Sequence, residues 1–195
     1  MTRIGILALQ GDFEEHLASL RQLEVEGVQV RLPADLQGLN GLIIPGGEST
    51  TIGKLAVTYD LIGPLKKFGR SNAIWGTCAG AIFLSKDARR DQPLLGLMDI
   101  RVERNAFGRQ AQSFTIDLDV PALKDPQRPF PAVFIRAPVI ERAGAGVTVL
   151  ATLPGEGGDP VIVAARQGRF LATSFHPELT GDSRFHRYFI HMAGS

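Results

Sequence analysis

The sequence has little of several features that define large classes of protein. One cysteine among 195 residues excludes an intrachain disulfide and suggests a protein of a reducing compartment. The 21 basic and 20 acidic side chains leave a net charge of +1, without the basic excess typical of nucleic-acid binders. No apolar run approaches the ~18 residues of a transmembrane helix, and residues 4–9 are too short for a signal peptide. These absences predict a cytoplasmic globular protein that binds neither nucleic acid nor membrane.

The remaining composition is that of an ordinary globular protein. Hydrophobic residues make up 44% and charged residues 21% of the chain, which argues against disorder. A chain of this length can bury a sizeable core without a metal or disulfide, and it shows no internal repeat or linker. We therefore predict a single domain spanning residues 1–195.

Short apolar runs alternate with helical patterns in the first half of the chain. Strands are expected at residues 4–9, 28–32, 41–44 and 73–75. Asp12 is expected to cap a helix that Gly27 ends, and one of Ser49, Thr50 and Thr51 to cap a second. Strands interleaved with helices in this way predict an α/β fold: an open, mostly parallel sheet with helices on both faces.

The second half is richer in β-structure. Apolar pieces separated by Pro and Gly turns predict strands at residues 100–103, 114–118, 132–135 and 147–150. Residues 161–164 and 170–175 indicate an antiparallel hairpin, and Asp182 is placed to cap a closing helix. The parallel core should therefore carry additional antiparallel strands.

The strand at residues 73–75 leads directly into Gly-Thr-Cys-Ala-Gly at residues 76–80. This is the thiol form of a nucleophile elbow, in which small flanking residues let the backbone turn sharply. The N-terminus of a following helix carries partial positive charge, which favours a thiolate. A buried structural cysteine is the alternative, but its framing by small residues favours Cys78 as a nucleophile.

A thiolate nucleophile needs a base, and the chain has four histidines. His16 falls in an apolar stripe of an expected helix, and His186 and His191 fall in the closing helix, so structural or surface roles are the ordinary interpretation. His176 differs, because it follows a strand and precedes a proline, which favours extended backbone. His176 is therefore the candidate base.

Glu178 lies two residues beyond His176 and is the candidate for the third member of a catalytic triad. In extended backbone the two side chains project to one side, where a carboxylate fixes the tautomer of an imidazole and stabilises the imidazolium. We predict a catalytic triad in the chain order Cys78, His176, Glu178. Acyl transfer also needs donors for the oxyanion, and the backbone N–H groups of Gly47 and Ala79, at the same sheet edge, are the candidates.

Six segments in this order resemble blocks of the class I (triad) glutamine amidotransferases. The resemblance is closest to one branch, the glutaminase subunits of pyridoxal 5′-phosphate synthase. The segments are residues 8–11, 45–50, 76–80, 103–110, 134–138 and 174–180. The resemblance implies a flavodoxin-like α/β fold, with an open, mostly parallel sheet, helices on both faces and additional antiparallel strands.

The resemblance also implies a reaction, the hydrolysis of L-glutamine to L-glutamate and ammonia. Cys78 would form a glutamyl thioester, while His176 protonates the ammonia and then activates water. Glu48 is one candidate partner for the substrate ammonium, and a guanidinium fork suits its α-carboxylate. The positions implied to bind glutamine are Gly47, Glu48, Ser49, Arg104, Ile135 and Arg136.

A partner is implied as well, because the glutaminase fold accounts for the whole length of this sequence. In the resembling family the partner is a separate synthase subunit, a (β/α)₈ barrel in a hetero-oligomer with the glutaminase. It joins ammonia with a pentose phosphate and a triose phosphate to make pyridoxal 5′-phosphate. Gln10 resembles a position near the partner, and we hypothesise that docking reorients the Gly46–Gly47 peptide. Neither a metal nor another cofactor is expected, since no His/Cys cluster is recognisable in the sequence.

Three alternatives remain open at this point. A cysteine-dependent peptidase or deglycase could use a similar elbow, and an amidotransferase subunit could serve a different synthase. A flavodoxin-like binding module would use Cys78 for no chemistry and would resist labelling by a glutamine-mimicking chloroketone. Release of glutamate from glutamine would distinguish an amidotransferase from a peptidase or deglycase. Co-purification with the barrel synthase would distinguish it from a subunit that serves a different synthase.

Overall fold

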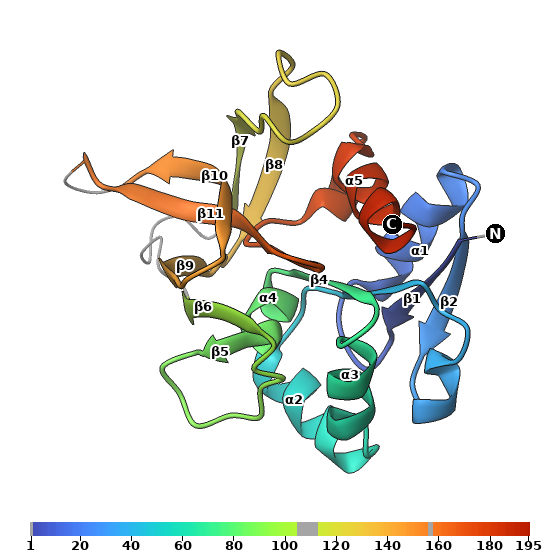
Figure 1. The fold of residues 1–195 in the computed structure, drawn as a ribbon. Helices are drawn as coiled ribbons and strands as arrows, with labels where there is room; N and C mark the ends of the chain where they lie inside the picture. The colour runs from blue at the N-terminus through green and yellow to red at the C-terminus, as the bar shows by residue number, and fades with distance from the viewer. Residues whose placement is uncertain (1, 105–112, 156–157) are drawn as a thin grey trace.

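A computed structural model describes residues 2–104, 113–155 and 158–195. Its main sheet has the strand order β2-β1-β3-β4-β12-β11-β9-β6-β5, with β10 paired to β11. The contiguous block from β2 to β12 is parallel, and most of the remaining pairs are antiparallel. The predicted fold class, a mostly parallel α/β sheet with added antiparallel strands, is confirmed (Figure 1).

The parallel block is made of short apolar runs, and every residue of β3 and β4 is buried, as expected of strands covered on both faces. Its strands are β1 (Arg3–Leu7), β2 (Glu26–Val30), β3 (Gly41–Ile44), β4 (Ala73–Thr77) and β12 (Phe170–Thr173).

Beyond β12 the sheet continues with strands that are mostly antiparallel, β5 being parallel to β6, and it includes two strands that the sequence pattern did not indicate, β5 and β9. The strands of this part are β5 (Ser85–Asp87), β6 (Met98–Glu103), β9 (Val139–Ala143), β10 (Thr148–Pro154) and β11 (Pro160–Gln167). A separate two-stranded ribbon of β7 (Ser113–Leu118) and β8 (Phe130–Ile135) projects from the body in Figure 1.

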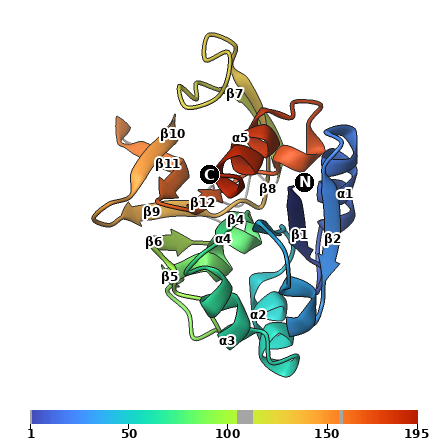
Figure 2. The ribbon, with the colours of Figure 1, turned by 45° about the vertical axis from the view of Figure 1, so that its right-hand side comes forward.

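Helices cover both faces of the sheet (Figure 2). One apolar core contains α2 (Ser49–Thr58), α3 (Ile62–Phe68) and α4 (Ala79–Leu84), and the other contains α1 (Phe13–Gln22) and α5 (Arg184–Ala193). Two short 3₁₀ helices are η1 (Pro33–Leu36) and η3 (Pro177–Leu179). None of the helices in the described parts of the chain is long and apolar enough to cross a membrane.

Several expected helix ends are wrong, because the capping residues have other partners. Asp12 makes no side-chain cap for α1, and its carboxylate faces His176 instead. Helix α1 ends before Leu23, so Gly27 lies in β2 rather than at a helix terminus. The side chain of Glu48, not a hydroxyl of the following residues, caps α2 by accepting from the Thr51 N–H.

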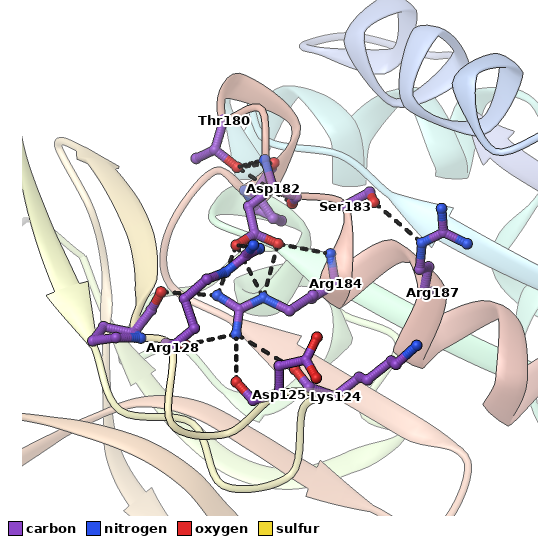
Figure 3. Close-up of polar contacts among 10 residues, drawn as sticks. Lys124, Asp125, Arg128, Thr180, Asp182, Ser183, Arg184 and Arg187 are labelled. Carbon is purple, nitrogen blue, oxygen red and sulfur yellow. Dashed lines mark hydrogen bonds and ion pairs between the residues drawn. The ribbon is translucent and has the colours of Figure 1, made fainter.

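Asp182 contributes to the start of α5 through a larger cluster (Figure 3). Its carboxylate accepts from the Arg184 N–H at 3.0 Å and from the Arg184 guanidinium at 2.7 Å, while Ser183 occupies the cap position. The same guanidinium donates to backbone carbonyls of the segment before β8, those of Arg128 at 2.6 Å and Pro129 at 2.8 Å. This cluster fixes the segment that leads into β8, the strand that delivers Ile135 to the site described next.

Candidate active site

Four neighbouring parallel strands deliver the predicted chemical groups to one edge of the sheet. The segments after β1, β3, β4 and β12 carry Gln10, Gly47, Cys78 and His176, respectively. Ligands of open α/β sheets bind at this carboxyl edge, where connections diverge to opposite sides of the sheet. The strand order therefore explains how residues up to 166 positions apart in the chain meet, from Gln10 to His176.

Cys78 lies at a sharp turn between β4 and α4. Its backbone has φ +48° and ψ −108°, a conformation that costs a non-glycine residue of the order of 1–3 kcal/mol. The turn depends on small neighbours, because a Cβ on Gly80 would lie 2.0 Å from the Ile44 backbone oxygen. The thiol is 4.0 Å from the backbone oxygen of Ile135 and the side chain is almost fully buried. This geometry is that of a strained nucleophile elbow.

His176 and Glu178 lie together next to this turn. The His176 Nδ1 is 2.7 Å from Glu178 Oε1, and the ring lines the same cavity as the Cys78 side chain. The backbone reason differs from the predicted one, because Pro177–Leu179 forms a 3₁₀ turn rather than continuing an extended strand. The turn still brings the two side chains together.

The pKa values in this group are displaced in a consistent way. Burial lowers the pKa of His176, but hydrogen bonds and charges of Cys78 and Glu178 outweigh burial and raise it to about 10. Burial raises the pKa of Glu178, against the opposing hydrogen bond and charge of His176. A raised pKa keeps His176 protonated near pH 7, so that the ring can donate a proton at the cavity.

A cavity of about 330 Å³ opens beside the thiol, a size suited to an amino acid. All six positions that the resemblance implied for glutamine line this cavity. The complete lining is Asp12, Gly47, Glu48, Ser49, Cys78, Ala79, Ile82, Arg104, Ile135, Arg136, Pro138, His176 and Leu179.

Gly47 and Ala79, the expected oxyanion donors, both lie on the cavity wall with the thiol. Ala79 is the first residue of α4, so its N–H has no acceptor within the helix. Gly47 has φ +147°, and a Cβ there would lie 2.5 Å from Gln10 Oε1, so only glycine fits. The Gln10 side chain also accepts from the Glu48 N–H at 2.7 Å, and it thereby holds the glycine loop.

Glu48 and Arg104 form a charged wall of the cavity. An Arg104 Nη donates to Glu48 Oε1 at 2.6 Å, and Thr51 N–H donates to Oε2 at 2.8 Å. Burial raises the pKa of Glu48, but hydrogen bonds from Thr51 and Arg104 outweigh it and lower the pKa to about 2. Glu48 is therefore an anion already paired with Arg104, while Arg136, with φ +42°, lies exposed at the cavity.

Asp12 was not foreseen as a site residue, and it creates a cluster that the sequence did not reveal. Ligand atoms of Asp12, His176 and Glu178 lie within 4.8 Å of one another, close enough to surround a metal ion. The His176 Nδ1 is 2.7 Å from Glu178 Oε1 and 3.4 Å from Asp12 Oδ2. We interpret the cluster as an imidazole held by two carboxylates, because the one ring nitrogen facing them already carries the hydrogen bond to Glu178.

Two buried histidines behind Glu178 were also missed. His16 and His186 are 0% and 1% exposed, so the expected structural or surface roles describe them incompletely. The apolar stripe that includes His16 was the available signal, since it places this side chain on the buried face of α1. Of the resembling block at residues 103–110, positions 105–110 lie outside the described residues, so only Glu103 and Arg104 can be placed.

Comparison with known proteins identifies relatives along nearly the whole chain. A family model described as SNO glutamine amidotransferase matches residues 6–195. A protein of Pelotomaculum thermopropionicum named pyridoxal 5′-phosphate synthase subunit PdxT is 57% identical over 190 residues, covering 96% of this chain and 93% of the relative. A protein of Roseiflexus sp. with the same name is 56% identical over 193 residues, covering 97% and 99%. A solved structure described as a glutamine amidotransferase superposes with a TM-score of 0.90 at 52% identity, covering 98% and 99%.

The fold and the cavity edge with its elbow cysteine define the class, that of the glutamine amidotransferases. Within that class, the chain belongs to the SNO glutamine amidotransferase family. This membership sets aside the peptidase, the deglycase and the non-enzymatic binding module as interpretations of the elbow.

Proposed function

We propose that this protein hydrolyses L-glutamine to L-glutamate and ammonia through a thioester on Cys78. The observation that carries the proposal is the contact of three groups at one cavity. Cys78 and His176 lie on the wall of the same cavity, close enough for the charge of Cys78 to raise the pKa of His176, and the ring is held by Glu178 at 2.7 Å. The cavity of about 330 Å³ in front of them suits an amino acid with a side-chain amide.

The chemistry proceeds in two halves. In the first, the Cys78 thiolate attacks the amide carbonyl, and the oxyanion forms beside the N–H groups of Gly47 and Ala79. The C–N bond then breaks as the His176 imidazolium donates its proton to the departing ammonia. In the second, neutral His176 takes a proton from water, the hydroxide attacks the thioester carbonyl, and glutamate leaves as the thiolate reforms. Glu178 holds the ring and stabilises its charged form throughout.

The polar ends of glutamine match the charges of the cavity. Arg136 is exposed at the cavity and forms no ion pair with a carboxylate within the described residues, so it suits the α-carboxylate. Arg104 can add a second donor, and the Glu48 carboxylate beside it suits the substrate ammonium. Ser49 and Ile135 complete the wall of the cavity beside these charges.

The ammonia is supplied to a synthase subunit that makes pyridoxal 5′-phosphate from a pentose phosphate and a triose phosphate. The names of the relatives at 57% and 56% identity support this partner over other synthases. Free ammonia is mostly protonated at neutral pH, so direct transfer within a complex is needed for it to act as a nucleophile. We place the complex in the cytoplasm, where the single thiol stays reduced.

Gln10 supports a link between partner docking and activity. Its Oε1 holds the Glu48 N–H, next to the Gly46–Gly47 peptide whose rotation would aim or withdraw an oxyanion donor. We expect docking at Gln10 to reorient this peptide, so that the isolated chain hydrolyses glutamine slowly. Equal glutaminase rates with and without the synthase subunit would contradict this switch.

The test of the function is glutamate release by wild type and by Cys78→Ala, each with and without the synthase subunit. We expect activity in the wild-type complex and none in either Cys78→Ala sample. His191→Gln is the matched control, because His191 is the exposed histidine of α5 and lies away from the cavity lining. Undiminished glutamate release by Cys78→Ala would overturn the proposal.

A further inference from the structure

Behind Glu178 the hydrogen-bonded groups continue inward across the core. Glu178 Oε2 lies 3.4 Å from His16 Nε2, and His16 Nδ1 lies 3.0 Å from His186 Nε2. The His16 Nε2 is also 3.3 Å from the Thr77 hydroxyl, on the residue that precedes the nucleophile. Three elements distant in sequence, α1, η3 and α5, therefore bring an ordered row of polar groups to the back of the triad.

The buried polar atoms of these groups have few other hydrogen-bond partners. Glu178 Oε2 and His186 Nδ1 are buried, and neither forms a hydrogen bond within the described residues. The Trp75 ring packs edge-on against both imidazoles, with centroids 5.8 Å from His16 and 5.1 Å from His186. A buried carboxylate oxygen without a donor is costly, so the His16 Nε2 at 3.4 Å is its natural partner once the site tightens around substrate.

The network selects one set of tautomers. If His186 Nε2–H donates to His16 Nδ1, then His16 carries its proton on Nε2 and can donate it to Glu178 Oε2. The group then left unpaired is the His186 Nδ1 lone pair. The opposite arrangement would bury an N–H of His186 without an acceptor and would aim a lone pair of His16 at the carboxylate. The first arrangement is therefore the favoured one.

We propose that His16 is a positioning residue of the glutaminase, which donates from Nε2 to Glu178 Oε2 and is itself oriented by His186. This inference rests on the proposed function. With one oxygen held by His16, the carboxylate keeps its other oxygen on His176 Nδ1, and the second ring nitrogen of His176 stays directed at Cys78.

The charge state of the two inner histidines suits this role. Burial, followed by the charges of His186 and His176, lowers the pKa of His16 far below its usual value, and burial lowers the pKa of His186 to about 4. Both are neutral donors near pH 7 and leave the negative charge of Glu178 for His176. Within the described residues, the carboxylate of Asp12 also faces the His176 ring, at 3.4 Å from Nδ1.

The test compares two substitutions at one position. An asparagine amide reaches about where Nδ1 stands, and a glutamine amide about where Nε2 stands. His16→Gln therefore keeps the donor to Glu178, while His16→Asn loses it with a similar change in polarity and size. Steady-state glutaminase kinetics in the complex with the synthase subunit, over a range of pH, are measured for both variants, for wild type and for His191→Gln.

We expect His16→Asn to lower kcat about tenfold to a hundredfold, by analogy with the loss of the hydrogen-bond partner that orients a metal-bound histidine, with KM within about threefold. Its alkaline limb in kcat/KM should move about one unit to lower pH, because a less well-held carboxylate raises the pKa of His176 less. His16→Gln should recover most of kcat and keep the wild-type limb. A purely structural role would reduce the amount of active enzyme without moving the limb.

Equal kinetics for the asparagine and glutamine variants, or an unchanged alkaline limb in His16→Asn, would overturn the positioning role. The proposed function would still stand in that case, provided that the wild-type complex hydrolyses glutamine. An inactive wild-type complex would instead overturn the function. If thermal unfolding shows that His16→Asn does not fold, His186→Phe replaces it, because phenylalanine can pack against Trp75 while removing the donor to His16. A smaller loss of kcat with the same direction of pH shift is then expected, and wild-type kinetics would contradict the proposal.

Discussion

Glu178 and Asp182 are two buried carboxylates four positions apart in the chain, 7% and 8% exposed, with opposite surroundings. Asp182 accepts hydrogen bonds from two guanidinium groups and a backbone N–H, and its pKa is lowered although burial alone would raise it. Glu178 has one histidine at hydrogen-bond distance and an oxygen without a bond, and burial raises its pKa.

The comparison separates a structural cluster from the one that we propose to be catalytic. The Asp182 cluster satisfies its charges and anchors four backbone carbonyls through Arg184, so its cost of burial is offset in the folded state. The Glu178 group leaves polar atoms unpaired next to a residue of positive φ. Incomplete satisfaction and strain are typical of sites where the groups must change charge during a reaction.

Removing the nucleophile should have the largest effect and should fall on activity alone. Cys78→Ala is expected to lose about 10⁴-fold or more in kcat, because the other members of a triad cannot act without it. The free energy of unfolding should change by less than about 1.5 kcal/mol, since a small side chain is replaced by another. Glutamate release and denaturant unfolding measure the two quantities. A large loss of stability in Cys78→Ala would contradict the distinction between the structural cluster at Asp182 and the proposed catalytic group.

Removing the Arg184 guanidinium should have the converse effect. Arg184→Met leaves Asp182 partly unpaired and backbone carbonyls without donors, so we expect a loss of about 3–5 kcal/mol in the free energy of unfolding. Glutamine turnover per folded chain should stay near wild type. Arg187→Met is the control, because Arg187 is an exposed arginine on the same helix whose guanidinium donates to the Ser183 hydroxyl. Equal unfolding curves for the two variants would contradict the structural role.

Neutralising each carboxylate sharpens the same contrast. Glu178→Gln should lower kcat about 10²- to 10⁴-fold, because an amide does not stabilise the imidazolium and does not hold the productive tautomer. It should cost less than about 1 kcal/mol in stability, since His176 can become neutral. Asp182→Asn should cost about 2–3 kcal/mol and leave kcat unchanged. If the two variants lost activity and stability in the same proportion, the distinction between the clusters would fail.

The smallest effects concern pH, and they have opposite signs at the two sites. The lowered pKa of Asp182 contributes stability that is present above about pH 4 and is lost as pH falls through the folded value. The raised pKa of His176 contributes stability that is fully present below about pH 6.5 and is lost as pH rises toward about 10. Denaturant unfolding across pH should lose its acid slope in Asp182→Asn and part of its alkaline slope in Glu178→Gln.

The elbow and the order of its partners could be predicted from the sequence because they rest on local signals. A strand followed by small residues around Cys78, a glycine pair after β3 and a histidine after β12 each mark a strand end, and parallel strands bring such ends together. The mostly parallel sheet followed from the same alternation.

The remaining parts depend on tertiary contacts that local patterns do not encode. Asp12 matched a helix cap but instead faces His176, and Pro177–Leu179 turns where extended backbone was expected. The burial of His16 and His186 depends on α1 and α5 packing on the same face of the sheet. No periodicity within either helix could show that His16 reaches Glu178 or that His186 reaches His16.

Covalent labelling with a glutamine-mimicking chloroketone tests the central claim most directly, since the chain has one cysteine and a single mass adduct locates the site. In the complex with the synthase subunit we predict one adduct per chain, prevented by L-glutamine, absent in Cys78→Ala and formed more slowly in Glu178→Gln. An intact mass without adduct, or labelling that L-glutamine and Glu178→Gln leave unchanged, would contradict the assignment of Cys78 as a nucleophile supported by His176 and Glu178.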